Sequence, residues 1–417
     1  MNNIRDDYQI SYTDKEIQYA VLGLMLLPLY IKLMSQLSAI ISFPTVITTV
    51  LYYGCIWLFI VKYAVNNLKS FIFNLAQIGI LLLIFSVFCC VMGNTGTEFI
   101  FRYNIQEIVT FQPTTLFFTA MYMILGISIQ DYDSFSLRLH VVSKIGVIFG
   151  LLIYCFGLIS GNILYYDDMN YAYALCLLVC CLLAGYTKND LPYVVIGVLC
   201  LLLAGTRGPL ICITVAFLLR SFMGEKNIQT ILGRVLFCII ALVSLYSGVL
   251  TWVLEKLMGL MGGFGITQLR ILDYMNNGML LDSSGRDGFS DIIKEAIRER
   301  PVLGYGIGAD RSLLPLGRYC HNIILEVLVS LGVILGSIVL LWIFYRVLKM
   351  LTSKKESYKV IAIAFLSGEI IKLFLSSTIL QSELLFVFLG MSIVATGRIK
   401  WRNPVSGITG ELNEHTE

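Results

Sequence analysis

The residues best suited to chemistry lie in and beside one polar stretch, residues 255–320, of a chain that is otherwise strongly apolar. Arg286 lies within this stretch, and His321 follows directly after it, where the next apolar run begins. Arginine donates two parallel hydrogen bonds to one phosphate and keeps its charge at any working pH. Histidine, with an unperturbed pKa of about 6.5, can take a proton from a hydroxyl near neutrality. These residue types favour group transfer from a phosphate-linked donor to an alcohol.

Two further polar residues accompany this pair. Arg207 interrupts two apolar runs, and an arginine near the membrane rim is either a snorkelling anchor or a functional cation. Arg207 gains functional weight if Arg286 and His321 approach the same side of the protein. Asn322 is expected either to orient His321 or to cap the helix that starts there. The structural alternative for His321 is a helix-start residue bonded to a loop carbonyl.

The polar stretch also contains a glycine-rich segment, Gly304-Tyr305-Gly306-Ile307-Gly308. A phosphate-cradling glycine loop needs a preceding strand and a following helix N-terminus, and the sequence indicates neither. We predict a tight turn that lets the backbone pass close to a bulky neighbour. We also assign Gly304, Tyr305 and Gly306, with Asn322, to substrate binding, since tyrosine offers a flat aromatic face with a polar hydroxyl.

A short amphipathic helix is predicted just before this turn. Its apolar face has helical spacing and comprises Phe289, Ile292, Ile293, Ala296 and Ile297, and charged side chains fill the opposite face. We predict Ser290 as the N-cap and Pro301 as the stop. Such a helix is expected to lie on the membrane surface or on the helical bundle.

Composition defines the elements that must position these residues. Of the 417 residues 57% are hydrophobic and 14% are charged, which excludes a water-soluble globule. The runs are apolar all round, so the prediction is an all-α polytopic membrane bundle of about 12 transmembrane helices rather than a barrel. The expected spans are 17–37, 40–61, 71–93, 114–129, 141–160, 169–186, 191–205, 209–223, 235–254, 321–348, 358–376 and 379–397.

The short connections carry their lysines and arginines mainly on one side, which predicts that both termini are cytoplasmic and that the long loop is exported. The predicted organisation is an N-terminal transmembrane bundle (1–254), a periplasmic loop (255–320) and C-terminal transmembrane helices with a short tail (321–417). Most of the 11 cysteines lie in apolar runs, so no disulfide framework is expected. The net charge of +3 is too small to favour nucleic acid.

Four short motifs follow one another along the chain: Gly205-Thr206-Arg207-Gly208, Ser284-Gly285-Arg286, the run Pro301 to Gly308, and His321-Asn322-Ile323-Ile324-Leu325-Glu326. In order and spacing this set resembles the O-antigen polymerase and ligase superfamily over roughly residues 200–345. The resemblance implies a membrane glycosyltransferase of the helical C-type (GT-C) class. Such enzymes act at the outer face of the bacterial inner membrane on sugars carried by undecaprenyl diphosphate. No metal, nucleotide or other cofactor is expected.

Carried onto this sequence, the resemblance implies that Arg207 and Arg286 bind the donor diphosphate. His321 would activate the acceptor hydroxyl or orient the sugar, with Asn322 in support. The expected partners are an undecaprenyl-diphosphate-linked oligosaccharide, the lipid bilayer and a chain-length regulator. A polymerase is favoured over a ligase, because ligases often carry a second histidine just before the His-Asn pair. Arg318, Tyr319 and Cys320 precede the pair here.

Three other interpretations stay open. Asp167 and Asp168 offer a metal site, although adjacent aspartates in a short loop are usually solvated. A transporter would bury charges within the membrane, and Glu369, Lys372 and Glu383 are the candidates. A Cys-His nucleophile pair at Cys320 and His321 is disfavoured, because sequence neighbours at a helix start point in different directions.

Overall fold

The computed structural model describes residues 3–42, 44–91, 116–160, 169–204, 206–224, 286–315 and 318–396, with the isolated positions 232, 236 and 256. At Arg207 and Arg286 it describes the backbone without the side chain. Throughout this part of the chain the regular secondary structure is helical, without a strand, so the prediction of an all-α protein is confirmed.

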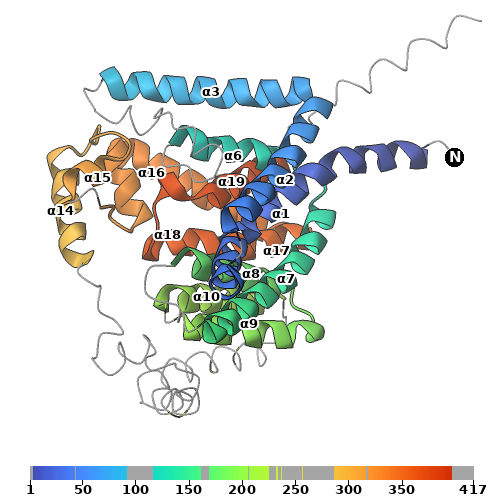
Figure 1. The fold of residues 1–417 in the computed structure, drawn as a ribbon. Helices are drawn as coiled ribbons and strands as arrows, with labels where there is room; N and C mark the ends of the chain where they lie inside the picture. The colour runs from blue at the N-terminus through green and yellow to red at the C-terminus, as the bar shows by residue number, and fades with distance from the viewer. Residues whose placement is uncertain are drawn as a thin grey trace, which may run out of the picture.

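The helices before the long loop form the larger part of the bundle (Figure 1). They are α1 (Asn3–Ile41), α2 (Thr45–Asn66), α3 (Leu68–Val91), α6 (Leu116–Ser128), α7 (Tyr132–Ile159), α8 (Met169–Ala184), η2 (Lys188–Asp190), α9 (Leu191–Leu203) and α10 (Arg207–Gly224). The later elements are α14 (Arg286–Glu299), α15 (Ala309–Leu313), α16 (Ile323–Leu351), α17 (Glu356–Phe365), η6 (Leu366–Ile370), α18 (Ile371–Leu375), η7 (Ile379–Gln381) and α19 (Glu383–Thr396).

Among the described residues, four helices are individually long and apolar enough to cross a membrane: Asp14–Ile41, Thr45–Asn66, Tyr132–Gly157 and Ile323–Leu351. A helical membrane protein is expected to have such helices, because hydrocarbon offers no partners for backbone amides. The predicted apolar spans overlap described helices, although 358–376 divides into α17, η6 and α18 and 379–397 into η7 and α19. Of the span 235–254 only position 236 is described. The number of crossings and their orientation stay predictions, as do the three-part organisation and the long loop up to residue 285.

Helix α8 lies at the centre of the bundle and contacts α1, α7, α9, α10 and α17. Its cysteines, Cys176, Cys180 and Cys181, are buried with free thiols, as expected for cysteine acting as a small hydrophobe. By contrast, α3 lies at the edge of the bundle over α6 (Figure 1) and exposes apolar side chains such as Ile80 and Leu83. Exposed apolar side chains on peripheral helices are suited to contact with lipid.

Helix α14 confirms the predicted amphipathic helix and corrects two of its details. Ile293 and Ala296 are buried, and α14 packs on α16, so the helix lies on the bundle. Ile292 was assigned to the apolar face but is 43% exposed. Ser290 is not the N-cap, because the helix begins one turn earlier. The helix ends at Glu299, shortly before Pro301, as predicted.

Candidate functional site

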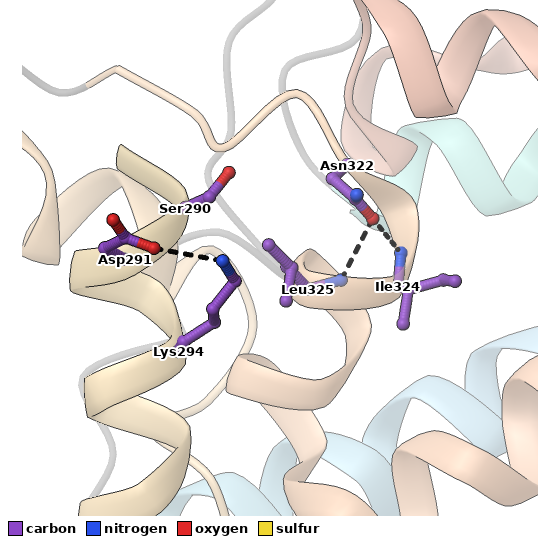
Figure 2. Close-up of a pocket in the computed structure, with 6 residues that line it drawn as sticks. All are labelled: Ser290, Asp291, Lys294, Asn322, Ile324 and Leu325. Carbon is purple, nitrogen blue, oxygen red and sulfur yellow. Dashed lines mark hydrogen bonds and ion pairs between the residues drawn. The ribbon is translucent and has the colours of Figure 1, made fainter. Parts of the chain in front are cut away.

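A pocket of about 440 Å³ lies between α14 and the start of α16, as Figure 2 shows. It is lined by Ser290, Asp291, Lys294, Asn322, Ile324 and Leu325. Lys294 forms an ion pair with Asp291 on the α14 side, with 3.0 Å between Nζ and Oδ1. Because α14 begins one turn before Ser290, the pocket brings the helix that carries Arg286 next to the His321-Asn322 segment.

Asn322 caps α16, which was one of the two roles expected for it. Its side-chain oxygen accepts hydrogen bonds from the N–H groups of Ile324 at 3.0 Å and Leu325 at 3.3 Å. These N–H groups lack a partner within the helix, so the cap stabilises the first turn. The side-chain amide nitrogen does not take part in this cap, and Asn322 also lines the pocket. A role in substrate binding therefore stays a prediction for that nitrogen.

His321 lies outside the helix, although the predicted span 321–348 included it. Helix α16 begins at Ile323, and His321 adopts a left-handed backbone conformation with φ of 54°. A non-glycine residue held in this region is strained, and such strain is concentrated at functional sites. The imidazole is half-buried against Tyr319, with 4.1 Å between the two ring centroids. The orientation of the His321 side chain is therefore set by its own backbone conformation and by Tyr319, before α16 begins.

Cys320, the residue before His321, is buried. Its N–H donates to Oδ2 of Asp310 at 3.1 Å, and its thiol donates to the carbonyl of Asn322 at 3.4 Å. Burial, together with the neighbouring Asp310 carboxylate, raises the pKa of Cys320 to about 12. The thiol is thus protonated at neutral pH, which argues further against a Cys320-His321 nucleophile pair, since the thiolate is the reactive form.

Asp310 is a buried acid that the site prediction did not include. Burial raises the pKa of its carboxyl above the ordinary value, and the hydrogen bond from the Cys320 N–H opposes that rise. Its second oxygen, Oδ1, has no hydrogen-bond partner among the described residues. The sequence signal was present, because Asp310 lies two residues after Gly308 and an acid is costly to bury. Asp310 holds the backbone just before His321.

Glu326 is a second buried acid that the site prediction did not include, although it ends the fourth of the short motifs. It is buried in the first turn of α16. Its carboxylate accepts a hydrogen bond from the hydroxyl of Thr378 and another, at 3.0 Å, from the N–H of Ile379. The phenol of Tyr319 donates to the carbonyl of Ser376 at 3.5 Å. The start of α16 is therefore tied to the segment between α18 and α19. An acid inside an apolar helix was the available signal.

The glycine-rich segment packs against a break in α16. Gly332 has φ of 73° and ψ of 172°, which interrupts the helical backbone. The N–H groups of Tyr305 and Gly306 donate to the carbonyls of Val329 and Ser330, at 2.8 and 2.9 Å. Val333 N–H donates outward to the carbonyl of Pro301 at 2.6 Å. The loop thus supplies the hydrogen-bond partners that the broken helix lacks.

The close approach predicted for this turn is confirmed, and its partner is backbone rather than a bulky ligand. A Cβ added at Gly304 would lie 2.5 Å from the Gly332 nitrogen, and one at Gly332 would lie 2.2 Å from the Val302 carbonyl oxygen. Backbone packing therefore accounts for Gly304 and Gly332. The phenol of Tyr305 donates a hydrogen bond to the carboxylate of Glu299 at 2.7 Å, and this bond raises the pKa of Tyr305. Substrate binding by Gly304, Tyr305 and Gly306 stays a prediction.

A second chain of contacts leads to α10 from Ser376, in the segment between α18 and α19. The N–H of Ser376 donates to the carbonyl of Lys372 at 2.8 Å. The Lys372 ammonium lies 5.8 Å from the centroid of the Tyr173 ring and 3.1 Å from Oε2 of Glu369. The Tyr173 hydroxyl reaches the backbone of α10, because a Cβ at Gly208 would lie 2.0 Å from it. Contacts therefore connect the first turn of α16 with the first turn of α10.

Several predicted site residues lie wholly or partly outside the described structure. The backbone of Arg207 opens α10 and that of Arg286 opens α14, but neither side chain is described. Ser284 and Gly285 lie outside the described residues, as do Asp167 and Asp168, the candidate metal ligands. Diphosphate binding by the two arginines stays a prediction. If it holds, the diphosphate would lie beside the starts of α10 and α14.

No protein-family model, curated protein or solved structure matches the chain. The resemblance to the O-antigen polymerase and ligase superfamily therefore rests on the four short motifs and their order. Within the described residues, the pocket lies between α14 and the start of α16, and the glycine turn packs on the break in α16.

Proposed function

We propose that this chain is an integral membrane glycosyltransferase that polymerises lipid-linked repeat units of a surface polysaccharide. The donor would be a growing glycan on undecaprenyl diphosphate, and the acceptor would be the non-reducing end of a new lipid-linked unit. The observation that carries the proposal is the set of contacts that leads from the segment around His321 to α14 and to α10. Across the pocket lies α14, which begins at Arg286, and the contacts through Lys372 and Tyr173 lead to α10, which begins at Arg207.

The proposed reaction is a single transfer. The acceptor hydroxyl oxygen attacks the anomeric carbon of the donor glycan and forms the new glycosidic C–O bond. The old C–O bond to phosphate breaks, and its electron pair leaves with undecaprenyl diphosphate. The hydroxyl proton passes to the imidazole of His321, and Arg207 and Arg286 stabilise the charge that develops on the diphosphate.

The surroundings of His321 suit this role because they hold a strained residue in one place. Asn322 caps the following helix, Asp310 binds the preceding N–H, and Glu326 anchors the first helical turn. A base must lie within hydrogen-bond reach of the proton it removes, so positional control contributes directly to rate. A histidine on a mobile loop would lack that control.

Purified protein supplied with lipid-linked repeat units tests the proposal. The units are given alone or with lipid A core, without nucleotide or metal, and the products are resolved on a gel. A ladder from the units alone is the expected result. Product that forms only with lipid A core would identify a ligase, and the absence of product in both reactions would overturn glycosyl transfer.

Transport of a lipid-linked sugar is the second candidate, favoured by one observation. The ion pair between Glu369 and Lys372 lies within the apolar bundle, where transporters place charges along a translocation path. Alanine at Glu369 that abolishes activity, while Arg286→Ala and His321→Ala are harmless, would favour transport. For the transferase, Arg286→Ala and His321→Ala are both expected to abolish activity.

A further inference from the structure

Lys372 belongs to the chain of contacts that connects the start of α16 with the start of α10. It belongs to α18, which directly follows a turn of π-helix, η6, within an otherwise apolar segment. Single π-helical turns are rare and occur frequently at functional sites. Its ammonium lies over Tyr173, whose hydroxyl meets the backbone at the start of α10. One tyrosine side chain therefore separates this lysine from the helix end that carries Arg207.

The start of α10 has a second feature that indicates a ligand. Thr206 directly precedes the helix and is 6% exposed, yet its hydroxyl oxygen has no hydrogen-bond partner among the described residues. A threonine in this position ordinarily accepts a hydrogen bond from an N–H of the first helical turn. The N-terminus of an 18-residue helix offers N–H donors and a positive dipole to an anion. A buried hydroxyl beside those donors suits a phosphate oxygen.

We propose that Lys372 binds a phosphate of the donor diphosphate together with the N-terminus of α10, an inference that rests on the proposed function. The Lys372 side chain is 20% exposed, whereas that of its partner Glu369 is 4% exposed, so Lys372 is the more exposed residue of the pair. An ammonium has three N–H donors, and Glu369 does not use all of them. Glu369 holds the lysine in position, while the remaining donors face the phosphate.

Affinity for the lipid diphosphate tests this assignment. Binding of undecaprenyl diphosphate and of undecaprenyl monophosphate is measured on the full-length protein in nanodiscs. Lys372→Met is expected to weaken diphosphate binding about 10- to 100-fold, as for loss of a hydrogen bond to a charged group. The monophosphate, bound mainly through its lipid chain, is expected to change less. Lys372→Arg keeps the charge and is expected to recover most of the affinity.

A paired substitution separates phosphate binding from a structural ion pair. Glu369→Gln combined with Lys372→Met removes both charges of this ion pair, so this double variant is expected to fold but still bind diphosphate weakly. Wild-type affinity in the double variant would overturn the proposal. Lys359→Met is the matched control, because Lys359 pairs with Glu356 at the same i,i+3 spacing elsewhere in the bundle. It is expected to bind normally.

The two proposals can fail separately. If the wild type polymerises lipid-linked units but neither Lys372 variant alters diphosphate affinity, the assignment of Lys372 is wrong and the proposed function stands. If the wild type forms no polymer but binds the diphosphate through Lys372, the phosphate site stands and glycosyl transfer is overturned.

Discussion

Replacement of Gly332 by alanine tests how the glycine turn and α16 depend on each other. The new Cβ would lie 2.2 Å from the Val302 carbonyl oxygen, and both groups belong to backbone that cannot simply rotate away. The backbone angles at Gly332, φ of 73° and ψ of 172°, fall in a region that is almost exclusive to glycine. The substitution must therefore separate the turn from the helix or strain both.

The cost follows from the contacts that would be lost. The unfavourable backbone conformation costs about 1–3 kcal/mol, and each lost hydrogen bond between loop and helix about 0.5–1.5 kcal/mol. The bonds at risk are those from Tyr305 to Val329, from Gly306 to Ser330 and from Val333 to Pro301. The expected destabilisation is on the order of 3–6 kcal/mol, concentrated in the turn and the first half of α16. His321 lies just before that half, so activity should fall more than helix content.

The assay combines melting in detergent with polymer formation. We expect Gly332→Ala to melt at a lower temperature than wild type and to form little polymer. Gly288→Ala is the matched control, because a Cβ at this α14 glycine meets no atom within 4 Å. It should match or slightly exceed wild-type stability, since alanine favours helix by about 1 kcal/mol over glycine. A Gly332→Ala variant with wild-type melting and chain length would refute the reasoning.

Two other predictions follow from the candidate site, and a third concerns Asp190 at the start of α9. Arg286→Ala and His321→Ala should each remove polymer without lowering the amount of folded protein in the membrane; wild-type chain length in either variant would exclude its assigned role. Cys320→Ser should keep activity, because burial raises the thiol pKa to about 12, and slow maleimide labelling of Cys320 at pH 8 would check this. Burial opposes ionisation of Asp190, but hydrogen bonds from Thr187 and Lys144 outweigh it and lower the carboxyl pKa from 3.8 to about 2. The resulting stabilisation, about 2 kcal/mol, should be present above pH 3.8 and disappear as the pH falls through 2. Asp190→Asn should remove that pH dependence, and melting curves across this range measure it.

The sequence alone determined the class of fold and most of its elements. Long apolar runs must form helices in hydrocarbon, because backbone groups there find partners only within their own segment. The spacing of Ile293 and Ala296 likewise predicted which face of α14 is buried, since helical periodicity is a local property. The start of α14 was misplaced, because Ser290 is compatible with both a cap and a helical position and no local residue decides between them.

The partners of the site residues were decided only by tertiary structure. The glycine turn was visible in the sequence, but its contact with Gly332 depends on how α16 packs against the loop. Asp310 meets the backbone of Cys320, and Glu326 meets Thr378, across separations that no helical period relates. Lys372, Tyr173 and Gly208 come from three separate helices and meet only when the bundle closes. Local patterns specify which segments are helical and which faces are apolar, whereas the pairing of distant polar groups depends on the packing of the whole chain.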